Sequence, residues 1–369
     1  MGKLNLVLIH PVEFDCNIAC GYCYNGSSRT LRDKPSRLIS METLELLFAG
    51  MAKVAGGNFT VIWHGGEPLL AGKEFYRSAI EAQRRVVGNR CKVRHCVQTN
   101  GTLIDSEWVD LFEKYDVAPS FSMDGPKDLH DAVRVRPDGT GTYDDVLRGY
   151  NLSRNRGIRT GLMVVVSSVN VSYPERMWEW ILKQGITSLD FMPCFEPELV
   201  CAGRPRFSVT EDDMTRFLVR SFDLWFDHGD PNIRIRTFRE TIKGMIGARN
   251  GVCSWNGSCL NNISIAQDGR VFPCSRYHSY PEMTYGTLGP NTLEELMTSP
   301  STISTREGIA RAQDQCPDCR WFPICHSGCP FLRYAIAGTW DAPYVHCSSR
   351  QALFAHIEKR ITSHVSGVR

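Results

Sequence analysis

The sequence lacks the features that mark several classes of protein. It contains no apolar run near the length of about eighteen residues that a membrane span needs, and its N-terminus has no basic-then-apolar signal pattern. Lys and Arg total 42 against 40 for Asp and Glu, so no excess charge would attract nucleic acid or an anionic membrane. No repeat or low-complexity tract stands out. These absences favour a cytoplasmic protein with neither a membrane nor a nucleic-acid partner.

Cysteine, by contrast, is abundant. The chain has 15 cysteines, and cytosolic thiols are seldom joined in disulfides because the cytosol is reducing. We therefore expect most of these cysteines to bind metal. The 369 residues are 42% hydrophobic, which is enough chain and enough apolar surface for two domains with a substantial core.

The first half of the chain alternates β-branched runs with amphipathic stretches. Strands are expected at 4–9, 59–63, 93–97, 117–123, 161–166 and 188–192, and helices at 41–54, 74–87, 106–115, 143–155 and 174–183. Ser40 is a plausible N-cap for the first helix. Such alternation predicts parallel strands with right-handed crossovers, and ligand sites beyond their carboxyl ends. Six units are fewer than a closed barrel has, so we expect an α/β fold with a partial (β/α)6 barrel.

The pattern changes twice in the second half. Residues 210–245 read as helical, with aromatic side chains that we interpret as packing, and beyond 251 cysteines and short strands at 262–266 and 271–273 replace the alternation. A final helix is expected near 351–361. We therefore expect four parts along the chain: a partial barrel at 1–209, a helical bridge at 210–250, a cysteine-rich domain at 251–350 and a C-terminal helix at 351–369.

Three cysteines follow the first expected strand at short spacings: Cys16, Cys20 and Cys23. Their thiolates share one tight loop and can face a single point. A structural zinc site takes four protein ligands, whereas an iron–sulfur cluster held by three cysteines keeps one iron open for chemistry. On spacing alone, a zinc site completed from elsewhere and simple buried thiols remain open alternatives.

This C-x3-C-x2-C motif, with Tyr22 beside its last cysteine, resembles that of the radical S-adenosylmethionine (SAM) superfamily. The resemblance implies that Cys16, Cys20 and Cys23 hold a catalytic [4Fe–4S] cluster and that SAM chelates its fourth iron. One electron then cleaves SAM to methionine and a 5′-deoxyadenosyl radical, which removes a hydrogen atom from the substrate. SAM is thus a consumed co-substrate.

A second motif, Gly65-Gly66-Glu67-Pro68, follows the second expected strand. Two glycines let backbone carbonyls approach a cation closely, and a carboxylate adds a charge-assisted acceptor. The same letters also make an ordinary turn. In its place after the cysteine loop, the motif resembles the one that receives the amino group of SAM in the family.

Other strand-end residues are similar to family segments that approach SAM. The resemblance implies direct contacts for Asn100 and Ser122, which follow the third and fourth strands. Asp124 is a further cofactor-binding candidate that could instead face the substrate. Arg134 could pair with the SAM carboxylate, with a surface arginine as the alternative.

Eight cysteines crowd the C-terminal region, in a segment too small to build much of a hydrophobic core. They suggest two four-cysteine metal sites, although spacing leaves both the grouping and the metal open. The run C-x2-C-x5-C-x3-C with a distant last cysteine resembles the SPASM domain of radical SAM peptide-modifying enzymes. That resemblance implies two auxiliary [4Fe–4S] clusters, the first held by Cys253, Cys259, Cys274 and Cys329, the second by Cys316, Cys319, Cys325 and Cys347. Left over, and expected as free buried thiols, are Cys91, Cys96, Cys194 and Cys201.

Within the superfamily the pattern resembles the anaerobic sulfatase-maturating enzymes, which oxidise a cysteine or serine of a sulfatase to formylglycine. Those enzymes carry an aspartate base directly after the third cysteine of the first auxiliary cluster, where this chain has Ser275. A serine hydroxyl is a poor base at neutral pH. His278 or His326 could substitute, although histidines in such loops are more often structural.

The first interpretation is therefore a maturase that forms a carbon–carbon or thioether crosslink in a ribosomally made peptide. Sulfatase maturation is second. Expected partners are the precursor peptide or protein, an electron donor such as flavodoxin or ferredoxin, and a separate leader-peptide-binding protein as a further candidate. A non-enzymatic zinc or electron-transfer protein is the alternative from another class, but it leaves the Gly65-Gly66-Glu67-Pro68 motif unexplained.

Overall fold

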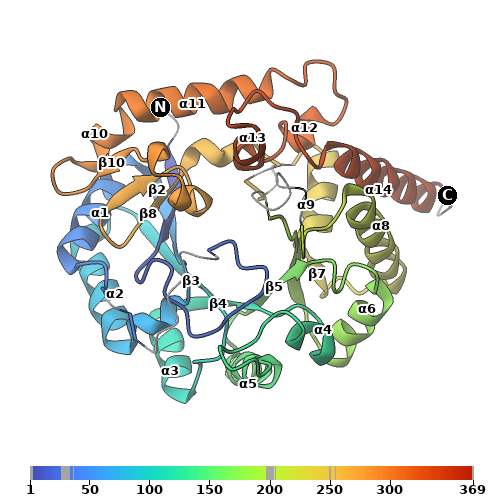
Figure 1. Ribbon diagram of the computed structural model, residues 1–369, viewed down its shortest axis with the longest axis horizontal. Helices are drawn as coiled ribbons and strands as arrows, with labels where there is room; N and C mark the ends of the chain where they lie inside the picture. The colour runs from blue at the N-terminus through green and yellow to red at the C-terminus, as the bar shows by residue number, and fades with distance from the viewer. Residues whose placement is uncertain are drawn as a thin grey trace. The chain divides into compact units, whose positions relative to one another are not determined.

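The structure is a computed structural model that describes residues 3–25, 34–35, 37–196, 203, 205–248, 251–253 and 255–367. These residues form two compact units. The first unit comprises 1–122, 134–160 and 259–307, and the second comprises 123–133, 161–258 and 308–369. The first unit therefore combines early and late parts of the chain, and the second combines middle and late parts; Figure 1 colours the chain by residue number.

The first unit is built on a sheet whose central strand is β1 (Leu4–Ile9). On one side β1 pairs in parallel with β2 (Ala55–Trp63), followed by β3 (Lys92–Thr99) and β4 (Val117–Ser122). Parallel neighbours need crossover connections, which here are helices. The helices that follow these strands in the unit are α1 (Met41–Val54), α2 (Lys73–Val87), α3 (Ser106–Tyr115) and α5 (Tyr143–Asn155).

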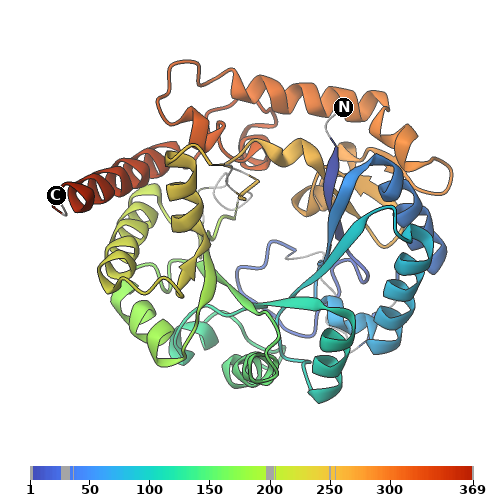
Figure 2. The same cartoon turned by 180° about the vertical axis from the view of Figure 1, so that it is seen from behind.

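The other side of β1 is occupied by a strand from the cysteine-rich region. β8 (Asn262–Ile265) runs parallel to β1, and β9 (Arg270–Phe272) and β10 (Gly286–Thr287) extend the sheet antiparallel. Figure 2 shows these late strands beside the first one. The sequence predicted short strands here, but not that one of them pairs with β1.

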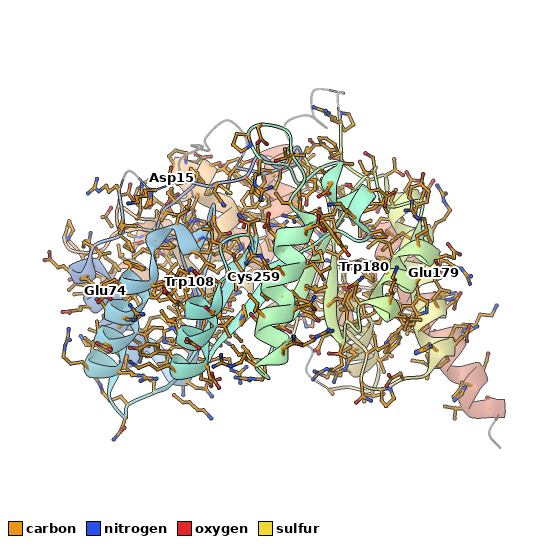
Figure 3. All side chains as sticks on the ribbon, turned by 90° about the horizontal axis from the view of Figure 1, so that it is seen from below. Asp15, Glu74, Trp108, Glu179, Trp180 and Cys259 are labelled. Atoms are coloured by element: carbon orange, nitrogen blue, oxygen red, sulfur yellow. The ribbon has the colours of Figure 1, made fainter. Side chains whose placement is uncertain are left out.

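Local signals explain where the helices of this unit begin. The Ser40 side chain accepts a hydrogen bond from the Thr43 N–H at 3.0 Å, so the predicted N-cap of α1 is confirmed. The helices cover the sheet with aromatic rings: Trp63 meets Tyr76 edge-on at 5.2 Å, and Tyr76 meets Trp108 at 5.3 Å. Figure 3 labels Trp108 on α3.

The second unit contains the parallel strands β5 (Gly161–Val166), β6 (Ser188–Pro193) and β7 (Arg234–Ile235). Its main helices are α4 (Lys127–Asp131), α6 (Pro174–Lys183), α8 (Glu211–His228), α9 (Arg236–Met245), α12 (Phe322–Cys325), α13 (Pro330–Ala337) and α14 (Cys347–Gly367). Phe222 packs edge-on against Phe238 at 5.3 Å, which confirms that the aromatics of 210–245 serve packing.

Two differences from the sequence prediction have clear causes. The helical stretch 210–245 is broken after α8, because Gly229 adopts the left-handed conformation and Pro231 follows two residues later. The region after residue 251 also contains more helix than predicted, including α10 (Leu293–Met297) and α11 (Pro300–Gln313). Short 3₁₀ turns are η2 (Pro68–Ala71), η3 (Ser258–Asn261), η4 (Ser275–Ser279) and η5 (Pro281–Met283). Among the described helices, none is long and apolar enough to cross a membrane.

Candidate functional site

The cysteine loop leaves the carboxyl end of β1, where parallel-sheet architectures place their ligand sites. The Cys23 N–H donates to the Cys20 carbonyl at 3.2 Å, and the Ala19 N–H donates to the Val135 carbonyl at 2.6 Å. Burial raises the pKa of the Cys16 thiol to about 12, and nearby Glu67, Cys20 and Cys23 add to the rise. Metal binding at this loop must therefore displace thiol protons.

The two glycines of the second motif allow the cysteine loop to lie directly against it. A Cβ on Gly66 would stand 2.0 Å from the Asp15 carbonyl oxygen, and one on Gly65, whose φ is +114°, would stand 2.5 Å from the Glu13 carbonyl oxygen. The Gly66 and Glu67 N–H groups donate to those same two carbonyls at 2.8 and 2.7 Å. The two glycines thus permit a close backbone contact with the cysteine loop. The sequence motif had predicted a different role for them, the approach of backbone carbonyls to the amino group of SAM.

Glu67 is fully buried and its carboxylate is held by protein donors. One oxygen accepts from the Leu69 N–H at 2.9 Å and the Thr99 hydroxyl at 2.8 Å, and the other accepts from the Asn100 N–H at 2.7 Å. Burial raises the pKa of this carboxyl to about 7, although the three hydrogen-bond donors act to lower it. Glu67 therefore fixes the carboxyl end of β3, and its contact with SAM stays a prediction.

Asn100 joins the end of β3 to the cysteine loop. Its amide donates to the Asn17 side chain at 2.9 Å and lies 3.8 Å from the Cys16 sulfur, while its oxygen accepts from the Thr102 N–H at 3.0 Å. Ser122, at the end of β4, accepts a hydrogen bond from the Gln98 amide at 3.0 Å. The SAM contacts of both residues remain predictions.

Arg134 is a buried residue of the cysteine-loop environment, so the alternative of a surface arginine is wrong. Its guanidinium lies 3.8 Å from the Cys20 sulfur and 5.4 Å from the centre of the Tyr22 ring. Asp124 belongs to the second unit and is also fully buried. Its carboxylate accepts from the Val165 N–H at 2.9 Å and so ties its loop to the strand 161–166, while its contact with SAM or substrate stays a prediction.

A second group of cysteines surrounds a cavity in the second unit. Cys316, Cys319, Cys325 and Cys347 line it together with aromatic and basic side chains. Four thiols around one cavity are the donor set that a [4Fe–4S] cluster takes. The residues present therefore fit such a group.

The remaining four auxiliary cysteines are distributed over both units. Cys259 and Cys274 lie in the first unit, where both contribute, after burial, to raising the pKa of Tyr285. Cys253 and Cys329 lie in the second unit. Their grouping as one ligand set remains a prediction. Of the four leftover cysteines, Cys91 and Cys194 are buried and Cys96 is half-buried, while Cys201 lies outside the described residues.

Comparison with known proteins agrees with this geometry. Residues 14–181 match the Radical SAM superfamily, and residues 253–320 match SPASM, an iron–sulfur cluster-binding domain. The chain is a radical SAM protein with a SPASM domain. The predicted α/β fold and the predicted cofactors, SAM and three [4Fe–4S] clusters, are thereby confirmed.

Similarity to individual relatives extends over the whole length of this radical SAM protein. It is 27% identical over all of both chains to a cysteine-type anaerobic sulfatase-maturating enzyme of Clostridium perfringens. It is 28% identical to a serine-type enzyme of Bacteroides thetaiotaomicron, over 95% of this chain and 89% of the other. The structure of anSMEcpe with bound AdoMet and Cp18Cys peptide superimposes with a TM-score of 0.88 at 26% identity, over 99% of both chains.

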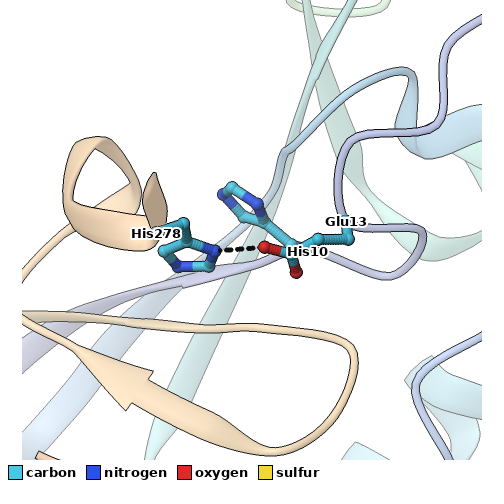
Figure 4. Close-up of side chains that lie close together, drawn as sticks. All are labelled: His10, Glu13 and His278. Atoms are coloured by element: carbon cyan, nitrogen blue, oxygen red, sulfur yellow. Dashed lines mark hydrogen bonds and ion pairs between the residues drawn. The ribbon is translucent and has the colours of Figure 1, made fainter. Parts of the chain in front are cut away.

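The radical SAM protein also contains a buried polar group that sequence reasoning did not assemble (Figure 4). His278 bonds through Nδ1 to the Glu13 carboxylate at 2.9 Å and through Nε2 to the Ser264 hydroxyl at 2.9 Å. The His10 ring lies 4.0 Å from the His278 ring, tilted by 32°. Burial lowers the pKa of His278 to about 3. In the sequence His278 stands far from His10 and Glu13, and nothing in their spacing predicts a contact.

Two histidines, His278 and His326, were the candidates to replace the missing aspartate base. Both ring nitrogens of His278 are engaged inside the protein, and Nδ1 of His326 is 2.9 Å from the Trp255 carbonyl oxygen. His278 is therefore a structural residue, whereas a base role for His326 stays a prediction. Ser275 itself is buried beside the Tyr24 hydroxyl, with which its side chain interacts.

Proposed function

We propose that this radical SAM enzyme is an oxidoreductase that converts a cysteine or serine side chain of a sulfatase to formylglycine. The similarity that carries the proposal is the match along the entire chain to enzymes named for that reaction, one of which binds AdoMet and a peptide in its solved structure. On the sequence alone we placed this reaction second, after peptide crosslinking. The similarity along the full length of the chain now favours it over crosslinking.

The reaction removes two electrons and two protons from the substrate. When bound, SAM and the N-terminal cluster supply the radical that takes one hydrogen atom from the β-carbon. One electron and one proton must then leave, which forms the carbon–oxygen double bond of the aldehyde from serine. From cysteine the same loss forms a carbon–sulfur double bond, which water hydrolyses to the aldehyde with release of hydrogen sulfide. The four-thiol cavity offers a site for an electron acceptor. Asn100 and Arg134 hold the cysteine loop in place beside Cys16 and Cys20.

Ser275 favours a second candidate, the crosslinking of a ribosomally made peptide. The proton of the oxidation needs an acceptor at hydrogen-bonding distance, about 2.6–3.2 Å, and a serine hydroxyl is a poor one. In a crosslinking reaction the substrate radical adds to a neighbouring group, so a base at this position is not required. His278, the histidine of the same turn η4, is fully engaged with Glu13 and Ser264.

The proposed function implies particular partners and a cellular location for the enzyme. A peptide or protein segment is the substrate, and a flavodoxin or ferredoxin supplies the electron that cleaves SAM. A separate leader-peptide-binding protein belongs with the crosslinking candidate. We place the enzyme in the cytoplasm, where a reducing environment would keep its thiols unpaired.

The test is an anaerobic assay with reconstituted enzyme, SAM, reductant and a peptide carrying a sulfatase motif with cysteine or serine. Mass spectrometry should detect aldehyde with the unmodified enzyme, and Ser275→Asp should form it faster because a carboxylate replaces the hydroxyl as base. A Cys16→Ala, Cys20→Ala, Cys23→Ala variant is the inactive control. Aldehyde from Ser275→Asp alone would favour the crosslinking candidate. No aldehyde from either protein would overturn the proposal.

A further inference from the structure

The four-cysteine cavity of the second unit also contains two side chains that aim nitrogen donors at its sulfurs. The Arg350 guanidinium lies 3.5 Å from the Cys325 sulfur. The Gln351 amide lies 3.6 Å from the Cys347 sulfur and 3.9 Å from the Cys319 sulfur. All of these residues line the cavity, and each distance is within the range of a hydrogen bond to sulfur.

The placement of these donors follows from the start of α14. Cys347 is the first residue of that helix, and Arg350 and Gln351 follow it by three and four positions. Residues at such spacings share one face of a helix. A single helical turn therefore supplies one thiol ligand and both donors.

Aromatic rings hold the Arg350 guanidinium in this position. Its central carbon lies 4.5 Å from the centre of the Tyr344 ring and 5.2 Å from that of Trp255. The residue is half-buried, so its charge is partly shielded from water. Such cation–π contacts are stronger where water is excluded.

The other arginine of the cavity, Arg333, bonds to loop carbonyls as well as to a thiol. The Arg333 guanidinium donates to the Ser327 carbonyl at 2.7 Å and also bonds to the Ala342 carbonyl. These contacts tie two loop segments together. The Arg333 side chain also hydrogen-bonds to Cys316, so it contacts one thiol while bracing the loops, whereas Arg350 contacts Cys325 and has no such loop carbonyls among the contacts described above.

The potential of an iron–sulfur cluster depends on net charge and on hydrogen bonds to its sulfurs. Reduction by one electron makes the cluster more negative. A positive charge and N–H donors at the sulfurs stabilise the reduced form more than the oxidised form, so they raise the potential. We infer that Arg350 and Gln351 raise the reduction potential of the cluster held by Cys316, Cys319, Cys325 and Cys347, and so make it a better electron acceptor.

The inference concerns the cofactor and not the substrate, so it can be tested without knowing the reaction. The experiment is a potentiometric titration of the reconstituted protein, followed by electron paramagnetic resonance of its reduced clusters, with iron content measured on each sample. The variants are Arg350→Gln, Arg350→Lys and Gln351→Leu. Arg320→Gln is the matched control, because Arg320 is an exposed arginine that pairs with Glu358.

Arg350→Gln should lower the ratio of reduced to oxidised cluster at least tenfold at a fixed potential, for one of the three clusters. A tenfold change in this one-electron step is 59 mV. Arg350→Lys should keep most of the potential, Gln351→Leu should cause a smaller fall, and Arg320→Gln should cause none.

An unchanged potential in Arg350→Gln with full iron content would overturn the inference. If Arg350→Gln loses the cluster, Gln351→Leu takes its place, because Gln351 is exposed and its replacement removes only the amide donors. An unchanged potential in Gln351→Leu would then also count against the inference, and a lowered one would support it.

Discussion

Replacing Gly66 by alanine should detach the cysteine loop from the motif that follows β2. The new Cβ would stand 2.0 Å from the Asp15 carbonyl oxygen and 2.7 Å from the Phe14 carbonyl carbon, about 1 Å closer than real Cβ contacts allow. Both obstacles are backbone atoms, so no side chain can rotate out of the way. Either the cysteine loop or the Gly65–Glu67 segment has to move.

The energetic cost can be estimated from what that movement breaks. Overpacking of a tight site costs about 1–3 kcal/mol. Separation of the loops also loses the two backbone hydrogen bonds from Gly66 and Glu67, at about 1 kcal/mol each. The sum is about 3–5 kcal/mol, which is a large share of the stability of an ordinary domain. The cysteine loop contributes the ligands of one cluster, so the loss should fall there.

The assay is iron content and SAM cleavage after anaerobic reconstitution. We expect Gly66→Ala to lose about four irons, the content of one cubic cluster, and to cleave no SAM. Gly161→Ala is the control, because its Cβ would meet nothing closer than 3.8 Å. Full iron content and normal SAM cleavage in Gly66→Ala would show that the contact between the loops is not needed.

Further predictions concern metal, acid stability and substrate binding. The unmodified protein should contain about twelve irons, as three cubic clusters, and the triple alanine variant of Cys16, Cys20 and Cys23 should contain about eight. An iron content near four in the unmodified protein would contradict the presence of two auxiliary clusters. Burial lowers the pKa of His95 from 6.5 to about 4, so acidification should cost about 3 kcal/mol of stability as pH falls from about 6.5 to 4, because the unfolded chain binds the proton more readily. His95→Gln should therefore show a shallower fall of the melting temperature over that range, and an unchanged profile would exclude His95 as a contributor. A truncation at Gly251 should bind substrate peptide poorly, as measured by fluorescence anisotropy, and normal binding would place the peptide site wholly before that residue.

The sequence predicted the α/β alternation well because periodicity and caps are local signals. The helices at 106–115 and 143–155 and the strand at 161–166 have the predicted bounds. Helix α10 was missed although Thr292 and Glu295 form a capping box, because the cysteines dominated the interpretation of that region. Helix α11 is rich in Ser, Thr and Ile, which have weaker helix propensity, and offers no clear apolar periodicity.

Contacts between distant residues were harder to predict than elements. Cys16, Cys20 and Cys23 were found because they stand close in the sequence. The structural role of Gly65 and Gly66 was predicted only in part. No sequence pattern indicates that the Glu13 and Asp15 carbonyls lie against these two glycines. The group of His10, Glu13, Ser264 and His278 spans more than 260 residues and has no spacing rule that could reveal it.

The pairing of β1 with β8 has a consequence for the order in which the protein is made. The Ser264 hydroxyl and the Leu8 carbonyl meet at 3.2 Å across 256 residues of chain. During synthesis, one edge of β1 therefore stays unpaired until residue 265 has left the ribosome, and contacts of such long range slow folding. Because Glu13 in turn bonds to His278 and Gln267, the segment leading into Cys16 completes its packing late. Delivery of iron and sulfide to the first cysteines should accordingly follow translation of most of the chain, and a ribosome-bound fragment ending before residue 262 should not retain that cluster.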